Sequence, residues 1–183
     1  MIAYKAFEKG LICRGYKFVM GLNTTDKANC AENGFHCAEN PLDCLSYYPN
    51  LKDSEYYLVD AGGDIDEDHN DSKIACTELN IIKKLGCEEL FLHGLAYMVD
   101  HPQRELSSHV ERDRANANGG YAVVRGLDPV ACGSVGDILA FAKENPMTGC
   151  IEQIALTCVD GEKVMPDTWY SVDLTERKVC EFV

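Results

Sequence analysis

The sequence predicts an α+β fold that is predominantly β, with a short-strand N-terminal module, one central helix, solenoid-like coils and a C-terminal β meander. Three observations favour this fold. Short aromatic and β-branched runs alternate with Gly, Asn and Pro turns. Helical periodicity is clear in only one stretch, and small apolar residues recur with glycines over residues 121–141. At 46% hydrophobic, the 183-residue chain has the composition of a folded globular protein.

The first half of the chain predicts short strands separated by turns. Strand-like composition is found at residues 4–7, 16–20, 35–37 and 55–59, and residues 74–85 predict one or two strands rich in Ile and Leu. Polar and Gly-containing turns are expected at residues 8–10 and 21–23. Together these elements predict a mostly-β module over residues 1–85.

A short helix is expected within this module, over residues 40–48. Asn40 can cap its N-terminus, Pro41 suits the first helical position, and Asp43 places negative charge in the first turn. Pro49 then ends the helix. The capping pattern therefore predicts a helix that is set by its own N-terminal residues.

The strongest helix prediction covers residues 87–100, where apolar side chains recur on one face. The polar stretch that follows, residues 101–118, predicts an exposed loop or a short helix. Residues 86–118 are therefore expected to form a helical and loop insert between two β modules.

The second β module is predicted over residues 119–183. In residues 121–141 small and apolar residues recur with glycines, a pattern that resembles two coils of a repeat solenoid. A meander of three strands should follow, and Asp160-Gly161 between the first two strands is a hairpin signal. The meander strands are expected at residues 151–159, 168–172 and 179–183.

The net charge of −13 is concentrated in two blocks. Residues 51–72 hold one base and eight acids, and residues 127–183 hold four bases and ten acids. Such an acidic field attracts basic surfaces and repels bare nucleic acid. The dense acidic loop in the first block is therefore the candidate surface for a partner. Its candidate contact residues are Asp64, Asp66, Glu67, Asp68 and Asp71.

Calcium binding is an alternative reading of this loop, since carboxylates stand at alternate positions as in an EF-hand. The pattern fails at its sixth position, which is His69 instead of Gly, and at its twelfth, which is Ala75 instead of Glu. A solvated hairpin loop and a partner-binding patch both remain open. We predict no metal site.

The ten cysteines contain no C-x-x-C pair, the spacing that zinc ribbons and thiol oxidoreductases need. Cys30, Cys37 and Cys44 are evenly spaced, but they cross turn residues and cannot share one helical face. The N-terminus lacks a signal-peptide pattern, and no apolar stretch reaches membrane-spanning length. The sequence therefore predicts reduced cysteines that act as small apolar core residues, in a soluble cytoplasmic protein without membrane contact.

No catalytic motif is found. The histidines form no H-E-x-x-H pattern, the serines no G-x-S-x-G elbow, and the paired glycines no phosphate loop. We therefore assign no catalytic residue and no cofactor.

One enzymatic alternative comes from the order of elements, which is similar to that of ADP-ribosyltransferase folds. The carrying residues are the opening Tyr4-Lys5-Ala6-Phe7, the Gly34-Phe35-His36 strand, a short helix ending in Tyr47-Tyr48, and Glu78 in a later strand. The resemblance implies NAD held by an Arg or His, an aromatic ring and a glutamate. The chain departs from the pattern at its first position, which has Lys5 in place of Arg or His.

Two further stretches resemble an uncharacterised phage and prophage protein family. The first combines Cys13-Arg14-Gly15-Tyr16 with residues 34–43 and 47–49, and the second is the closing segment at residues 159–170. The resemblance implies a phage-encoded protein acting in the host bacterial cytoplasm. Its small size and acidity are similar to those of type II anti-CRISPR proteins, which inhibit Cas9.

The resulting hypothesis is a non-catalytic inhibitor. A basic protein or nucleoprotein, in the specific form a Cas9–guide RNA complex, would bind the acidic loop, because Cas9 holds its duplex in a positively charged channel. A phage structural or assembly protein is a further alternative. Direct DNA binding stays open, since several arginines could form a local basic face or pair with neighbouring acids. These arginines are Arg104, Arg112, Arg114 and Arg125.

Overall fold

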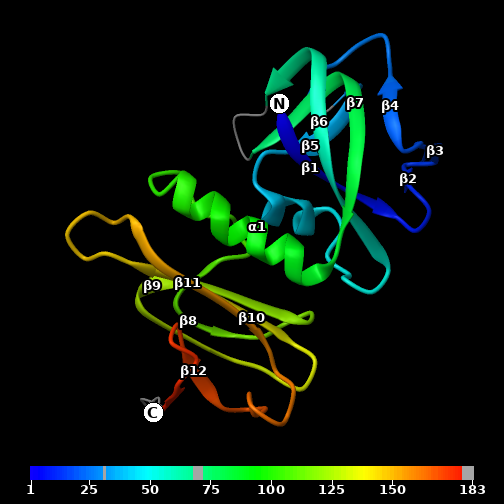
Figure 1. Cartoon of the computed structure of the whole chain (residues 1–183). Coiled ribbons are helices and arrows are strands. Elements are labelled where there is room, and N and C mark those ends of the chain that lie inside the picture. The colour runs from blue at the N-terminus through cyan, green and yellow to red at the C-terminus, as the bar shows by residue number, and fades with distance from the viewer. Residues whose placement is uncertain (31, 68–71, 179–183) are drawn as a thin grey trace. The chain divides into compact units, whose positions relative to one another are not determined.

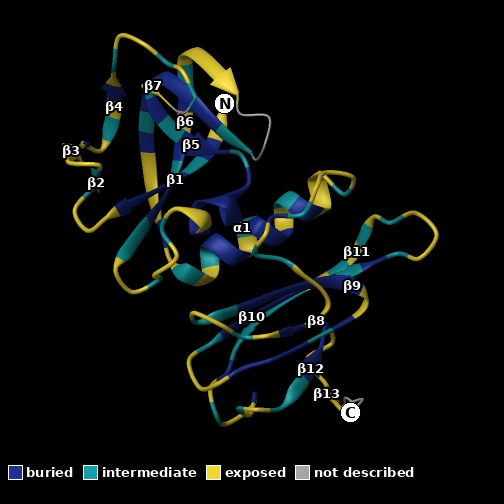
Figure 2. Ribbon diagram, turned by 180° about the vertical axis from the view of Figure 1, so that it is seen from behind, coloured by how far each residue is buried: buried dark blue, intermediate teal, exposed yellow. Residues whose placement is uncertain are grey.

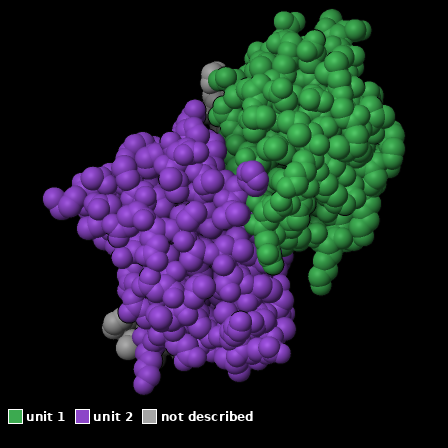
Figure 3. All heavy atoms as spheres, in the orientation of Figure 1, with its two compact units in different colours: residues 1–90 green, residues 91–183 purple. Residues whose placement is uncertain are grey.

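A computed structural model of the chain describes residues 1–30, 32–67 and 72–178. Within these residues it has thirteen strands, one α-helix and one 3-10 helix, which confirms the predominantly β fold class (Figure 1). The chain divides into two compact units, Met1–Leu90 and Phe91–Val183, which are coloured separately in Figure 3. The three-segment division predicted from the sequence differs from this one, because part of the expected insert joins the second unit as a strand.

The first unit is built on one sheet. Its strands are β1 (Ile2–Glu8), β2 (Ile12–Cys13), β3 (Tyr16–Lys17), β4 (Gly21–Thr24), β5 (Phe35–Ala38), β6 (Ser54–Glu67) and β7 (Lys73–Leu85). Strand β1 pairs with both β6 and β5, and β7 pairs with the same two strands. The pairing therefore runs in a closed circuit, β1–β6–β7–β5, around an apolar core that includes Phe7, Phe18, Val59 and Leu79.

The alternation of β1 decides which of its side chains face this core. Ala3 and Phe7 are fully buried in the core cluster, and Lys5 lies between them on the same side of the strand. Lys5 is itself only 5% exposed. The strand thus carries a cation at an inward position.

The structure corrects two local predictions in this unit. Residues 21–23, expected as a turn, belong to β4, which pairs with β7. The side-chain amide of Asn23 is buried and donates to the carbonyl of nearby Val19 and to that of Leu79 in β7. The bond to Leu79 is long-range, so no local pattern reveals it. Residues 64–67, expected as part of a loop, extend β6 beyond a register shift near Gly62 and pair with β7.

Both helix predictions are confirmed. The first is a 3-10 helix, η1 (Pro41–Ser46), whose Leu42 amide donates to the Asn40 side chain at 3.1 Å. The second is α1 (Cys87–Asp100), with Glu88 and Glu89 in its acidic first turn. No helix of the described chain is long and apolar enough to cross a membrane.

The second unit holds a six-stranded sheet. Its strands are β8 (Glu111–Asn116), β9 (Tyr121–Cys132), β10 (Ile138–Glu144), β11 (Ile151–Cys158), β12 (Trp169–Ser171) and β13 (Glu176–Arg177). Strand β9 pairs in parallel with both β8 and β10, and Ile138 faces Tyr121, 17 residues earlier. Successive parallel strands without an intervening helix are the pairing of a solenoid coil. Figure 2 shows β9 and β10 largely buried.

Two sequence predictions for this unit were wrong. Residues 111–116, expected in a loop or short helix, form β8. Strands β11 and β12, expected to pair through the Asp160-Gly161 turn, pair instead with β10 and β9. The Asp160 carboxylate accepts three backbone N–H groups, from Glu162 to Val164, so it closes a local turn without pairing its flanking strands. The predicted strand at residues 179–183 lies outside the described residues.

A largely buried ion pair ties the second unit together. Glu144 accepts a 2.5 Å bond from Arg125 and a bidentate pair from Arg112 at 2.8 and 2.9 Å. Arg125 also donates to the carbonyl of Pro102 at 2.8 Å. These bonds, those from Arg112 first, lower the pKa of Glu144. Of the four arginines for which a basic face or pairing with acids was left open, Arg112 and Arg125 pair with Glu144, and Arg125 is only 5% exposed.

We expect Glu144→Gln to destabilise the second unit by about 3 kcal/mol, because it leaves a buried arginine without its counter-charge. Trp169 is the only tryptophan and lies in this unit, so its fluorescence during urea unfolding reports the loss. The control, Asp128→Asn in the exposed pair with Arg177, should cost less than about 1 kcal/mol. Equal effects of the two variants would contradict the role given to Glu144.

The stability of the second unit should depend on pH through the bonds that Glu144 accepts from Arg112 and Arg125. Because the folded-state pKa of Glu144 is lowered, its contribution to stability is present above its ordinary pKa of about 4.3. It is lost as the pH falls through the folded value.

Candidate functional site

The first unit contains a cavity of about 520 Å³, which we call the Lys5 pocket. It is lined from β1, the β2–β3 hairpin, β5, η1 and the start of β7. Three of the lining side chains are cations, Lys5, Arg14 and Lys73. Six are aromatic, namely Tyr4, Tyr16, Phe18, Phe35, Tyr47 and Tyr48; the lining also includes Cys13, Cys37, Cys44, His36 and the carboxylate of Glu32.

Lys5 is the most unusual of these side chains. Its ammonium donates to the carbonyl of His36 at 2.5 Å and lies 3.8 Å from the sulfur of Cys13. It also lies 5.2 Å and 5.3 Å from the ring centroids of Phe7 and Phe18, a cation–π arrangement. No ion pair among the described residues involves it. A buried lysine is normally paired with a carboxylate, so the pocket holds an uncompensated positive charge.

Arg14 adds a second cation from a strained turn. The β2–β3 hairpin pairs Cys13 with Tyr16 through two residues of positive φ, Arg14 at 49° and Gly15 at 78°. A left-handed arginine is uncommon, and such strain is found at functional sites. Within the described chain, no carboxylate forms an ion pair with Arg14.

His36 lies where the positive charges converge. The pKa of His36 is lowered, first by burial and then by Lys5, Lys73 and Arg14. Its ring is therefore neutral at pH 7. Its Nε2 atom is buried and has no hydrogen-bond partner within the structure. Buried polar atoms are rarely left unsatisfied, and His36 lines the pocket, so a bound molecule is a candidate for the missing partner.

A thiol and a phenol complete the floor around Lys5. The hydroxyl of Tyr48 donates to the sulfur of Cys13 at 3.2 Å. Burial, followed by this bond, raises the pKa of Tyr48. Tyr48 therefore stays protonated throughout the physiological pH range, with its hydrogen donated to the sulfur of Cys13.

The aromatic side chains form a continuous cluster beside the cations. The ring of Phe18 lies 4.6 Å from Tyr16 and 4.9 Å from Phe35, between ring centroids. Tyr16 is about half exposed, as is Tyr47, whose ring lies 5.5 Å from the ammonium of Lys73. The pocket thus offers both charge and flat apolar surface.

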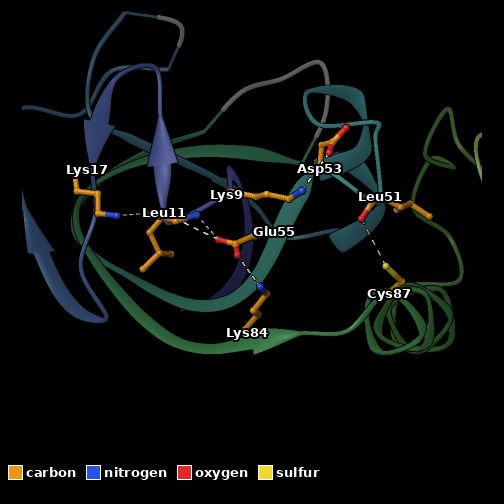
Figure 4. Close-up of polar contacts among 9 residues, drawn as sticks. Lys9, Leu11, Lys17, Leu51, Asp53, Glu55, Lys84 and Cys87 are labelled. Carbon is orange, nitrogen blue, oxygen red and sulfur yellow. Dashed lines mark hydrogen bonds and ion pairs between the residues drawn. The ribbon is translucent and has the colours of Figure 1, made fainter.

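The carboxylate of Glu55 stabilises the turn between β1 and β2, which leads into the lining of the pocket. Its carboxylate accepts the Gly10 amide at 2.9 Å, the Leu11 amide at 3.4 Å and the Lys84 ammonium at 2.6 Å (Figure 4). The Lys84 bond is the main cause of the lowered pKa of Glu55. Because this turn leads into β2, the network positions Cys13 and Arg14 at the pocket.

The loop before β5 forms another part of the wall. Gly34 has a φ of +90°, and a Cβ atom there would lie 2.9 Å from the Cα of Ala28, so only glycine fits. The amide of Cys30 donates to the carboxylate of Asp66 at 2.7 Å. Asp66, one of the predicted partner-binding acids, therefore anchors the pocket loop.

The other predicted acidic residues lie apart from the pocket lining. Asp64, Asp66 and Glu67 are exposed on the last residues of β6, which Figure 2 shows in yellow. Asp68 and Asp71 lie outside the described residues. The predicted acidic loop is thus, in its first four residues, an exposed strand end.

The structure brings together most of the elements that resembled a transferase. Lys5, the strand containing His36 and the Tyr47-Tyr48 pair all line one pocket. Glu78, which pairs with Thr24 and Gly62 in the sheet, does not line it. The carboxylate that lines the cavity is Glu32, and not the Glu78 to which the resemblance assigned this role.

The evenly spaced cysteines have different environments. Cys37 and Cys76 are free thiols whose side chains share a hydrogen bond, which raises the pKa of Cys37, and burial raises the pKa of Cys44 to about 12. Cys30 binds the strand of Asp66. In the described part of the chain, no group of three or more His, Cys, Asp or Glu side chains is arranged to hold a metal ion.

Comparison with known proteins finds one family. The model described as "Domain of unknown function (DUF7666)" matches residues 1–93, just over half of the chain. The matched range includes the whole Lys5 pocket. No curated protein and no solved structure matches the chain.

We expect the imidazole of His36 to titrate below its ordinary pKa of about 6.5 in the free protein, and to titrate higher when pyrophosphate is added. An anion near the three cations offsets the charges that disfavour the protonated ring. Proton NMR of the His36 ring, assigned with a His36→Gln variant, measures both values. An unchanged midpoint at saturating pyrophosphate would show that the anion does not reach this site.

Proposed function

The chain belongs to the DUF7666 family, a domain of unknown function, and we propose that its family-matched unit binds a small anionic molecule in the Lys5 pocket. The observation that carries the proposal is the buried ammonium of Lys5, which forms no ion pair with any described carboxylate. In a chain with a net charge of −13, counter-charges are abundant. A binding pocket lined by cations instead indicates that the missing negative charge belongs to a ligand.

The size and charge of the site favour a small molecule. A cavity of about 520 Å³ lies in the usual range of small-molecule sites. The acidic field of the whole chain disfavours the approach of a long polyanion such as DNA. A compact anion meets less of this repulsion once it is inside the pocket.

The proposal is binding rather than catalysis. The transferase hypothesis is supported by the shared pocket of Lys5, His36 and Tyr48, but Glu78 does not line it. Without a carboxylate at the required place, we do not extend the proposal to transfer of ADP-ribose. The bound molecule would then act as a signal or a structural ligand.

A second proposal retains the acidic strand end as a partner-binding surface. The supporting observation is that Asp64 and Glu67 are exposed at the far end of a long strand. The partner would be a basic protein or nucleoprotein, in its specific form a Cas9–guide RNA complex with its positively charged channel. In this proposal the protein is phage-encoded and inhibits that complex, without catalysis, in the host cytoplasm.

We expect Lys5→Met to weaken binding of inorganic pyrophosphate more than tenfold, measured by titration calorimetry. The first unit should be as stable as before or more stable, because the variant replaces an unpaired buried cation with an apolar chain of similar length. Thermal unfolding followed by circular dichroism measures this, with Trp169 fluorescence reporting the second unit separately. Lys9→Met, at an exposed lysine paired with Asp53, is the matched control.

Unchanged pyrophosphate affinity in Lys5→Met would contradict the first proposal. A variant that binds less and is also strongly destabilised would show that Lys5 is a structural residue instead.

For the second proposal, we expect the double variant Asp64→Asn with Glu67→Gln to bind a Cas9–guide RNA complex more weakly than the unchanged protein at low salt. The difference should shrink as salt screens the charges. The control double variant, Glu162→Gln with Glu176→Gln, removes the same two charges from exposed sites in the second unit. Equal binding by both double variants, measured by co-elution, would remove the strand end from the mechanism.

A further inference from the structure

The Lys5 pocket joins a cationic end to an aromatic end without a gap. The ammonium of Lys5 lies 5.3 Å from the centroid of Phe18, and Phe18 contacts both Tyr16 and Phe35. A ligand that places its negative charge at Lys5 must therefore place its neighbouring atoms against these rings. An inorganic anion alone would not make these contacts with the aromatic rings.

The amount of positive charge selects the anionic group. Lys5, Arg14 and Lys73 line the pocket together with one carboxylate, Glu32, so the charged side chains of the lining sum to 3 − 1 = +2. A carboxylate carries one negative charge, whereas a phosphate monoester carries close to two at neutral pH. Phosphate also accepts several hydrogen bonds at once, from ammonium and guanidinium groups. The charge balance therefore favours phosphate.

The aromatic end suits a flat ring larger than a phenyl group. Tyr16 is 48% exposed and packs by its edge against Phe18, which leaves ring surface for stacking. On the η1 side, Tyr47 is 51% exposed and also lines the pocket. Nucleobases stack well on such side chains.

Polar groups of the same lining suit a sugar or a base edge. The buried Nε2 atom of His36 has no partner within the structure. Thr25 and Asn33 also line the cavity. A ribose hydroxyl or a base nitrogen would supply the partner that this atom lacks.

We propose that the ligand of the Lys5 pocket is a nucleoside phosphate, with its phosphate at Lys5 and Arg14 and its base on the half-exposed ring of Tyr16, beside Phe18 and Phe35. This inference rests on the proposed function, since it names the class of anion that the pocket takes. It depends on the charges and rings around the cavity and not on the order of elements along the chain.

The test compares four probes by titration calorimetry at one ionic strength: ADP, pyrophosphate, adenosine and phenyl phosphate. We expect ADP to bind at least about tenfold more tightly than each of the other three, because base stacking adds to the phosphate contacts. ADP binding no tighter than pyrophosphate would overturn the nucleoside phosphate while leaving the proposed function in place. Failure of both to bind would overturn both.

Phenyl phosphate binding as tightly as ADP would also overturn the inference, in favour of a phosphotyrosine-like ligand. Variants of Tyr16 and Lys5 test which end of the pocket binds the base and which binds the phosphate. Tyr16→Ala should reduce ADP affinity to that of pyrophosphate and leave pyrophosphate binding unchanged, whereas Tyr16→Phe should retain both. Lys5→Met should weaken both ligands.

Thermal unfolding of Tyr16→Ala checks that the β2–β3 hairpin stays folded. If this variant unfolds, His36 ring shifts in the unchanged protein replace it. Adenine ring protons that show no contact with the Tyr16 or Phe35 rings at saturating ADP would overturn the stacking.

Discussion

The burial of the Lys5 ammonium without a carboxylate is the constraint on which the first unit is arranged. Strand alternation sends this side chain into the same core as Ala3 and Phe7, where a charge is costly. Around it the chain supplies the weaker forms of compensation, a backbone carbonyl, a thiol and two ring faces. These groups do not neutralise the ammonium, and the cavity beside it has space for an anion.

Much of the first unit serves to hold the wall of the pocket. Glu55 fixes the turn into β2, and Asp66 fixes the loop into β5. Gly34 lets that loop pass close to Ala28. The carboxylates of Glu55 and Asp66 thus lie outside the lining and bind backbone amides, and Glu55 also binds the exposed Lys84. Within the lining itself, a single carboxylate, Glu32, stands against three cations.

Sequence patterns predicted the features that depend on neighbouring residues. Asn40 capped its helix as expected, residues 87–100 formed the expected helix, and the glycine-rich stretch formed parallel coils. The closed strand circuit was beyond such patterns, because it depends on pairs such as Tyr4 with Ala38 that only the folded chain defines. The same is true of β4, which is held by Asn23 bonding to Leu79 across the sheet.

The pocket could have been noticed in part from sequence. Alternation in residues 3–7 places Lys5 on the apolar face, which is an anomaly visible without a structure. The resemblance to a transferase had grouped Lys5 with the strand of His36, but the approach of Arg14 and Lys73 could not be predicted, since it depends on how distant segments pair in the sheet. The acidic block could be recognised from sequence because charge density is a local property. One of its residues, Asp66, accepts a hydrogen bond from the Cys30 amide and so has a structural role.

The most direct test of the central claim is a crystal of the protein soaked in tungstate, an anion with a strong anomalous signal. The account predicts an anomalous peak within hydrogen-bonding distance of the Lys5 ammonium, with Arg14 or His36 as a second contact. Tungstate bound only at other sites, with water alone beside Lys5, would contradict it.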